Sequence, residues 1–313
     1  MKPLRYVALT VLLSVVSACA LQTEPTPSSP PITPSPTPSA MTTAYPFTTD
    51  DFPTLDGSTA TIPLGSLILQ RLTGMPKSQA DNIQFTTTSF AYSNMACQDP
   101  LDPSRGQIVL GYEPSADMKE EISNCEKLEY HPIGRDALVF ISNNKNPIDT
   151  LTTAQYKDIY TGKITNWSQL GGDDEKIVAY QRPETSGSQA LMRKFVMGSA
   201  AMASAPKEYQ SGEMGDLVDG VASYNDTGNA IGYSVYYYVN SMYAVPGIKI
   251  LAADGIFPTS QTIAEGSYPY VNDFYAVIRA DEPKNGPARK VVAWLESDQG
   301  QQTVADAGYV KIR

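Results

Sequence analysis

The segment from Arg182 to Ser188 reads RPETSGS and concentrates groups that bind anions. The guanidinium of an arginine can hold two oxygen atoms at once, and the hydroxyls of Ser186 and Ser188 can donate hydrogen bonds. The apolar spacing that follows predicts a helix starting here, with backbone N–H groups that have no partner inside the helix. Gly187 lets a ligand approach that backbone closely. The alternative is a capped surface helix with Arg182 paired to Glu184, and the residues alone leave both interpretations open.

A second segment, with the sequence DGSTAT, repeats this composition from Asp56 to Thr61. The Asp-Gly pair predicts a turn, and Ser58 and Thr59 supply hydroxyls at the start of an apolar-periodic helix. Taken alone, such a pattern is more often a plain helix cap. Two helix starts together with one arginine fit a tetrahedral oxyanion.

The composition argues against several other functions. The net charge is −10 without a block of Lys or Arg, so nucleic acid would be repelled. His131 is the only histidine and lies apart from any G-x-S-x-G motif, and the chain contains no Walker A motif. Two cysteines and this histidine do not make a four-ligand zinc site. We therefore expect no enzyme, no metal and no cofactor.

The first residues carry a targeting signal. Lys2 and Arg5 precede the apolar run 7–16, which is too short to span a bilayer and is typical of a signal peptide covering residues 1–18. The sequence VSAC ending at Cys19 resembles the bacterial lipobox, which predicts acylation of Cys19 and anchoring to the extracytoplasmic face of the membrane. The alternative is an ordinary signal peptide that leaves Cys19 as a free thiol.

The mature chain is expected to begin with a tether. Residues 19–44 are rich in Pro, Ser and Thr without apolar periodicity, which predicts a semi-rigid spacer. Beyond it, Cys97 and Cys125 are an even pair in an oxidising compartment. This favours a disulfide over two independently buried thiols.

The remaining chain alternates strand-like and helix-like segments, which predicts an α/β fold with mainly parallel sheets. Compact β-branched runs occur at 108–112 and 137–143, and an alternating run occurs at 230–239. Helical spacing with caps or glycine stops occurs at 59–74, 152–162, 188–198 and 288–308.

The order of these motifs resembles the phosphate-binding proteins of bacterial phosphate ABC transporters, the PstS family. The resemblance runs from about residue 54 to the C-terminal AGYVKIR, and its most specific part is TLTTAQYKDIYTGKITNW combined with R-x-x-x-S-G-S. It implies a type II periplasmic-binding-protein fold of two α/β lobes with the ligand in a cleft between them. Lobe one would comprise residues 45–136 and 256–313, and lobe two residues 137–255.

The resemblance also implies roles for individual residues. Arg182, Ser186, Gly187 and Ser188 match the anion loop of the family, with Ser188 in place of the usual threonine. Ser58 and Thr59 match the anion loop of the first lobe.

Two positions depart from the family pattern. The second loop, often rich in Gly and Ser, reads TTTSFAYSN here, with Thr88 and Ser89 as substitutes. Glu113 lies near the family's aspartate, which accepts the proton of hydrogen phosphate. If Glu113 points elsewhere, selectivity against sulfate would weaken.

The expected function is therefore capture of inorganic phosphate by a monomeric, lipid-anchored receptor that delivers it to a membrane permease and its ATPase. The alternatives are a receptor for another oxyanion such as sulfate, and a cell-surface signalling or adhesion module on the same fold.

Overall fold

The computed structural model describes residues 45–98, 105–114, 116–223 and 229–312. Cys19, the predicted signal peptide and the predicted tether lie outside these residues. Contacts join the chain from Ala44 onward into one compact unit. In the described part of the chain, no helix has the length and apolar character needed to cross a membrane.

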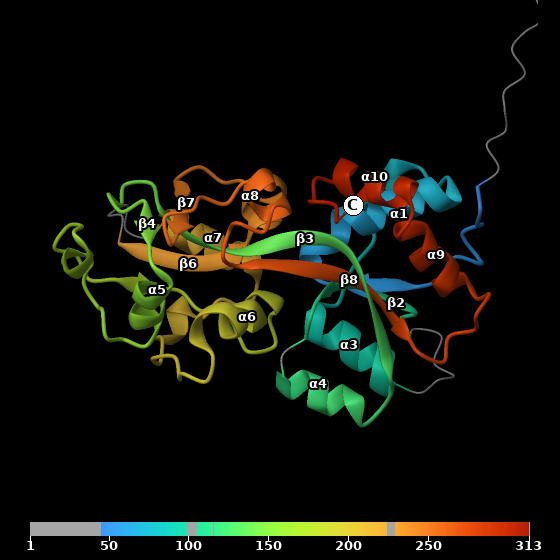
Figure 1. Ribbon diagram of the computed structural model, residues 1–313, viewed down its shortest axis with the longest axis horizontal. Helices are drawn as coiled ribbons and strands as arrows, with labels where there is room; N and C mark the ends of the chain where they lie inside the picture. Colours follow the sequence, from blue (N-terminus) through green and yellow to red (C-terminus); the bar gives the residue numbers. More distant parts are fainter. Residues whose placement is uncertain (1–44, 99–104, 115, 224–228, 313) are drawn as a thin grey trace, which may run out of the picture. The chain divides into compact units, whose positions relative to one another are not determined.

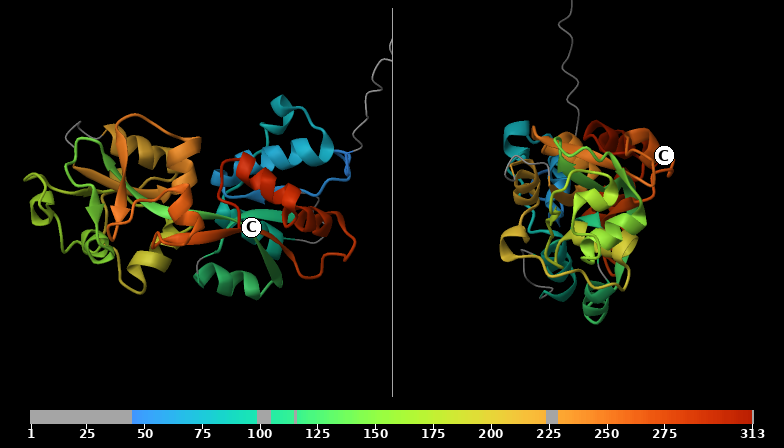
Figure 2. Two further views of the ribbon diagram at one scale, coloured as in Figure 1. Left: turned by 45° about the horizontal axis from the view of Figure 1, so that its top comes forward. Right: turned by 90° about the vertical axis from the view of Figure 1, so that its left-hand side faces the viewer.

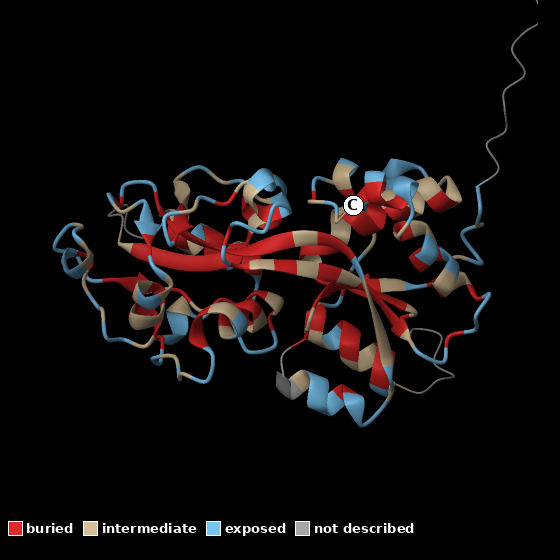
Figure 3. Ribbon diagram, viewed as in Figure 1, coloured by how far each residue is buried: buried red, intermediate tan, exposed pale blue. Residues whose placement is uncertain are grey.

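Two long strands connect the two lobes of this unit (Figure 1). Strand β3 (Leu128–Asn143) pairs antiparallel with β8 (Val271–Arg279) along its first ten residues, Leu128–Ala137. Beyond that point β3 pairs with two strands of the second lobe. The central strands are the most buried part of the molecule (Figure 3), so one continuous core runs along both lobes.

Lobe one surrounds the first part of β3. Its strands and helices are β1 (Leu55–Gly57), α1 (Ile62–Thr73), α2 (Lys77–Ala80), α3 (Thr88–Cys97), β2 (Ile108–Tyr112), α4 (Ala116–Ser123), α9 (Pro287–Leu295) and α10 (Asp298–Asp306). Strand β1 pairs parallel with β2, and β2 pairs antiparallel with β8. Helices cover both sides of this sheet (Figures 1 and 2).

Lobe two surrounds the second part of β3. It contains β4 (Thr150–Leu151), α5 (Thr153–Tyr160), β5 (Val178–Ala179), α6 (Gly187–Met192), α7 (Met214–Ser223), β6 (Ala230–Val235), β7 (Ile248–Ala253) and α8 (Ser260–Ala264). A π-helical turn, Arg193–Met197, continues α6 directly. Further short 3₁₀ or π-helical turns of this lobe lie at 167–170, 207–209 and 238–242.

The predicted helices form where local signals define their ends. Thr152 caps α5 by a reciprocal capping box with Gln155, and Gly74 ends α1 in the left-handed conformation. The predicted C-terminal helix is interrupted. Its first part ends at Leu295, and Ser297 caps a separate helix α10 by accepting a hydrogen bond from the backbone of Gly300.

The α/β fold of two lobes is confirmed, but the expectation of mainly parallel sheets is wrong. Among the strands of the described residues, parallel pairing is limited to the short pairs β1–β2, β4–β7 and β5–β6. The long strand β3 pairs antiparallel with all three of its neighbours. The reason is geometrical, since two strands that run between the lobes in opposite directions must pair antiparallel.

Residues 256–270, placed in lobe one by the sequence, pack against lobe two. The hydroxyl of Tyr268 donates to the carbonyl of Leu138 at 3.1 Å. The ring of Tyr270 lies 6.1 Å from that of Phe140, and its hydroxyl lies 2.7 Å from that of Thr153. The chain therefore returns to lobe one only along β8, because these buried tyrosines belong to the core of lobe two.

Candidate functional site

The first predicted anion loop lies at the end of β1. The backbone N–H of Ser58 donates to the carbonyl of Leu110 at 2.9 Å, and its hydroxyl accepts from the N–H of Ala60. A Cβ atom on Gly57 would lie 1.9 Å from the oxygen of Leu110, so only glycine allows β1 to approach β2 this closely. Ser58 is buried and caps a 3₁₀ turn, Thr59–Thr61, that leads into α1 at Ile62, and Thr59 is half-buried.

The second loop is tied to the first by Asp56. One carboxylate oxygen accepts from the N–H groups of Gly57 and Thr86, both at 2.7 Å, and the other accepts from the Thr86 hydroxyl at 2.6 Å. Thr87 follows with a φ of 102°, which a β-branched residue rarely adopts and which costs on the order of 1–3 kcal/mol. This conformation turns the chain into α3, so that Thr88 is its first residue.

Sequence reasoning missed both Asp56 and Thr87. A usable signal existed for Thr87, because the related loops are rich in glycine and a φ of 102° is one that glycine adopts easily. For Asp56, the Asp-Gly turn pattern concealed its role as a link between the two loops.

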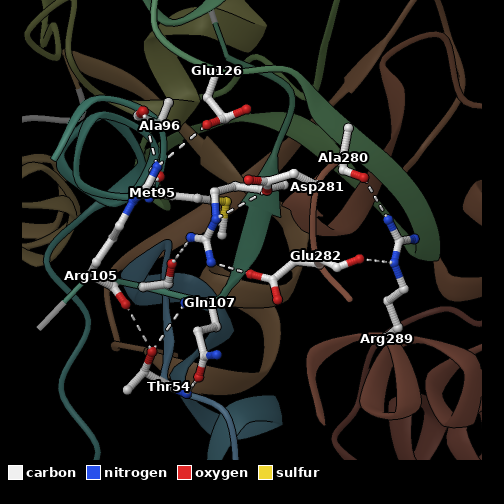
Figure 4. Close-up of polar contacts among 12 residues, drawn as sticks. Thr54, Met95, Ala96, Arg105, Gln107, Glu126, Ala280, Asp281, Glu282 and Arg289 are labelled. Atoms are coloured by element: carbon white, nitrogen blue, oxygen red, sulfur yellow. Dashed lines mark hydrogen bonds and ion pairs between the residues drawn. The ribbon is translucent and has the colours of Figure 1, made fainter. Parts of the chain in front are cut away.

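The far end of α3 is held by a buried arginine (Figure 4). The Nε of Arg105 donates to the carbonyl of Met95 at 2.9 Å, and its Nη2 donates to that of Ala96 at 3.3 Å. These carbonyls lie in the last turn of the helix, where a cation is favourable. Glu126 lies 3.8 Å from the same guanidinium. Helix α3 is therefore fixed at both ends, and its first residue is held in place.

The third predicted anion loop contains Arg182 and Ser186 and leads into α6 in lobe two. The hydroxyls of Ser186 and Ser188 lie 3.0 Å apart, and both residues are buried. Upstream, the backbone N–H of Arg182 donates to the hydroxyl of Tyr233 at 2.9 Å. The predicted helix start is confirmed, because α6 begins at Gly187.

Loops two and three meet across the lobes. A Cβ atom placed on Gly187 would lie 3.0 Å from the hydroxyl oxygen of Thr88 and 3.5 Å from the ring of Tyr112. The hydroxyl of Ser89 donates to the carbonyl of Thr185 at 2.6 Å. Glycine at position 187 therefore allows close approach of the lobes.

Loop one packs against β2, whose last residue lies next to loop three. A Cβ atom on Gly111 would lie 3.7 Å from the backbone nitrogen of Ser58. The next residue, Tyr112, is the one that packs against Gly187. The 3₁₀ turn that precedes α1 and the starts of α3 and α6 are thus grouped around the end of β2. We call this group, formed by Ser58, Thr88, Ser186, Gly187 and Ser188, the cradle.

Arg182 brings a partly buried cation to loop three. Its Nε and Nη1 atoms are shielded from solvent and have no hydrogen-bond partner among the described residues. Burial lowers the pKa of Arg182, and the negative charges of Glu213 and Asp216 act in the opposite direction. A buried cation without a bonded partner is costly, and an anion would satisfy it.

Glu113 has partners of its own. One carboxylate oxygen binds the ammonium of Lys119 in α4, and the other lies 3.2 Å from that of Lys194 in lobe two. Partial burial raises the pKa of Glu113, but the hydrogen bonds from Lys119 and Lys194 outweigh burial and lower it. The predicted acceptor of a ligand proton is therefore engaged by two cations.

A carboxyl group missed by the sequence analysis lies behind the cradle. Asp136 is almost fully buried in β3 and accepts the hydroxyl of Tyr112 at 2.7 Å. It also accepts the N–H groups of Ala137 at 2.8 Å and Tyr237 at 3.0 Å. Burial raises its pKa to about 6. Asp136 thus connects β2 of lobe one to the segment that follows β6 of lobe two.

The structure joins Cys97 and Cys125 in a disulfide, as the sequence predicted. This bond links the end of α3 to the chain that follows α4. Among the described residues, no group of three His, Cys, Asp or Glu side chains could hold a metal ion.

Comparison with known proteins points to one family of solute receptors. The chain is 26% identical over 210 residues to the phosphate-binding protein PstS of Bacillus subtilis, in a match that covers 67% of this chain and 66% of that protein. The chain thus spans just under two thirds of this relative. PstS of Borreliella burgdorferi is 24% identical over 201 residues, covering 62% of this chain and 69% of the relative.

Solved structures share the fold. One is a putative phosphate ABC transporter substrate-binding protein with bound phosphate from Clostridium perfringens, with a TM-score of 0.64 and 23% identity, covering 83% of this chain and 99% of that one. Another is an ABC-type phosphate transport receptor from Vibrio cholerae, with a TM-score of 0.60 and 20% identity, covering 82% and 98%. These relatives confirm the predicted resemblance to PstS proteins.

The model of the PBP superfamily domain matches residues 105–299, which are more than half of the chain. This range contains the end of β2, both strands that connect the lobes, and the whole of loop three. The chain therefore belongs to the PBP superfamily.

Proposed function

We propose that this protein is an extracytoplasmic receptor that binds inorganic phosphate in the cradle and delivers it to an ABC permease. The observations that carry the proposal are the Nε and Nη1 atoms of Arg182, which are shielded from solvent without a hydrogen-bond partner among the described residues, and the grouping of the predicted anion loops in the cradle. Several relatives are named phosphate-binding proteins. The fold and the grouped loops fit a binding protein rather than an enzyme.

The binding energy would come from charge-assisted hydrogen bonds. Each such bond contributes about 1.5–3 kcal/mol, which must offset the loss of hydration of the anion. Donors from a single exposed helix start are too few. The close packing of Gly187 against Thr88 supports the proposal that both lobes supply donors when they are close together.

Sulfate remains a second candidate because of Glu113. Phosphate near neutral pH carries a proton and sulfate does not, so a free carboxylate at the cradle would favour phosphate. The carboxylate of Glu113 is bound by Lys119 and Lys194 instead. We therefore expect weaker discrimination against sulfate than a free carboxylate would produce.

Calorimetric titration of residues 44–313 with phosphate and with sulfate tests the proposal. We expect binding of phosphate, and we expect Arg182→Ala to weaken it at least tenfold, because each lost charge-assisted bond is worth about 1.5–3 kcal/mol. Arg71→Ala is the matched control, since Arg71 pairs with Asp306 on α10. Absence of heat with either anion would disprove an anion receptor. Tighter binding of sulfate than of phosphate would instead support the second candidate.

Attachment to the membrane through Cys19 is a further part of the proposal. Cys19 follows a signal-peptide pattern, and a Pro-rich spacer separates it from the folded unit. Labelling of the full chain with a radioactive fatty acid in a bacterial host should mark the wild type and not Cys19→Ser. Equal labelling of both proteins would contradict acylation at this residue.

A further inference from the structure

A cavity of about 440 Å³, lined by polar and apolar groups in similar measure, lies in lobe two beside loop three. Arg182 and Glu184 form part of its wall, and residues 202–205 and 210–212 form another part. Liquid water occupies about 30 Å³ per molecule, so the cavity is much larger than a tetrahedral anion requires. Its size falls within the range of sites for small organic ligands, about 300–1,000 Å³.

Arg182 is common to the cavity and to the proposed phosphate site. It lines the cavity and belongs to the same loop as Ser186 and Ser188. The other arginine of the cavity wall, Arg193, forms an ion pair with Glu184. The positive charge not matched by such a pair therefore comes from Arg182, and an anion bound there would border the cavity.

Part of the remaining wall is suited to hydroxyl groups. Ser204 and Ser211 bring hydroxyls. The side-chain amides of Gln181 and Gln210 donate to the carbonyls of Ala203 at 2.9 Å and Ala205 at 2.7 Å, which holds both amides at the cavity wall. Hydroxyl and amide groups can each donate and accept hydrogen bonds. Such a wall favours a hydroxylated substituent over an aliphatic one.

A second cavity of about 340 Å³ adjoins the first. The two share Gln181 and residues 203–205. Room for a larger substituent is therefore available beyond the first cavity.

The surroundings of Glu113 reduce its repulsion of a doubly charged phosphate group. A phosphate monoester has lost its last proton at neutral pH, since its second pKa is about 6. A free carboxylate at the cradle would repel such a dianion, whereas Glu113 is neutralised by Lys119 and Lys194.

We propose that the protein also binds phosphate monoesters of small polyhydroxylated molecules, with the phosphate group on Arg182 and the cradle and the organic group in the lobe-two cavity. This inference rests on the proposed phosphate-binding function. It extends the ligand class from the inorganic ion to its monoesters.

Calorimetry with inorganic phosphate, glycerol 3-phosphate and glucose 6-phosphate tests this inference. The wild type should bind at least one ester within about tenfold of its affinity for phosphate. Gly212 lines the cavity, has an ordinary φ, and would present a Cβ atom to open space. Gly212→Trp should therefore fill the cavity and weaken ester binding at least tenfold, with phosphate binding within twofold of the wild type.

Two further variants complete the design. Gly212→Ala is the matched control and should leave the binding of all three ligands within twofold, because a methyl group leaves most of the cavity open. Ser204→Trp fills the same cavity from an exposed position and replaces Gly212→Trp if that variant fails to fold.

The outcomes separate this inference from the proposed function. Phosphate binding without binding of either ester overturns the inference and leaves the proposed function intact. Ester binding that both tryptophan variants leave unchanged overturns the assignment to this cavity. Failure to bind phosphate, sulfate or either ester overturns the inference and the proposed function together.

Discussion

Glu113 of lobe one and Lys194 of lobe two form an ion pair, with 3.2 Å between carboxylate oxygen and ammonium nitrogen. Lys194 also donates to the side-chain oxygen of Asn272 at the start of β8, at 2.7 Å. The ammonium group thus connects the end of α6 to lobe one and to a strand that joins the lobes. Because the pair spans the two lobes, it should stabilise only the arrangement in which they are close together.

Removing this ion pair should accelerate release of the ligand. A partly exposed pair contributes about 0.2–1 kcal/mol. Lys194→Met should therefore raise the dissociation rate of phosphate by up to about fivefold, with little change in the association rate. Stopped-flow fluorescence measures both rates. The effect should shrink with added salt, because screening weakens exposed pairs.

Lys119→Met is the matched control for this prediction. Lys119 binds the same carboxylate but lies in α4 of lobe one, so its contact does not span the lobes. Its replacement should leave the dissociation rate near that of the wild type. Equal acceleration by both variants would show that the charge of Glu113, and not the connection between lobes, is what matters.

A methyl group at position 187 should hinder the approach of the lobes. The added Cβ atom would lie 3.0 Å from the hydroxyl oxygen of Thr88, which is closer than ordinary van der Waals contact. Overpacking of this kind costs about 1–3 kcal/mol. Gly187→Ala should therefore weaken phosphate binding by about tenfold in calorimetry while leaving the denaturation midpoint of the free protein unchanged.

Gly212→Ala serves again as the reference, since its Cβ atom meets no neighbour. A Gly187→Ala protein that binds phosphate as tightly as Gly212→Ala would mean that the two loops are not in contact when the ligand is bound.

The contribution of Asp136 to the stability of the folded protein should decrease as the pH rises. Burial raises its folded-state pKa from 3.8 to about 6, so the folded protein holds a proton that the unfolded chain has already released. Its stabilising contribution is therefore complete below pH 3.8 and is lost as the pH rises through 6. A shift of about two units corresponds to roughly 3 kcal/mol. The neighbouring hydroxyls of Tyr112 and Tyr309 stay neutral in this range, because burial raises their pKa values.

Asp136→Asn isolates this contribution. The amide keeps the size of the carboxyl group, can accept the backbone N–H groups and can donate to Tyr112. The free energy of unfolding of the wild type minus that of Asp136→Asn should fall by roughly 2 kcal/mol between pH 4 and pH 7 in urea titrations. A difference that stays constant over this range would contradict the raised pKa.

The disulfide should stabilise lobe one without shaping the cradle. Cys97 and Cys125 are 28 positions apart. Closing a loop of this length lowers the entropy of the unfolded chain, which raises its free energy by about 3–4 kcal/mol at 25 °C. The double variant Cys97→Ser, Cys125→Ser should lose stability of up to this size in urea titrations. Its phosphate affinity should stay within about threefold, because Arg105 still holds the last turn of α3. A loss of affinity without loss of stability would contradict this division of roles.

The sequence by itself determined most of the local structure and indicated which loops we propose as the anion loops. The start of α6 at Gly187, the cap of α5 at Thr152 and the glycine end of α1 at Gly74 depend on residues within one or two turns. Such short-range signals are visible in a linear pattern. The order of the motifs also indicated the two-lobed fold, because related chains keep that order.

Only the tertiary structure decided how distant segments combine. The pairing of Glu113 with Lys194, the link from Tyr112 through Asp136 to Tyr237, and the packing of residues 256–270 on lobe two all join segments far apart along the chain. No local spacing encodes such contacts. A carboxylate at position 113 can face a ligand or a lysine with the same neighbours in sequence, and the choice depends on which side chains the folded lobes bring within a few ångströms.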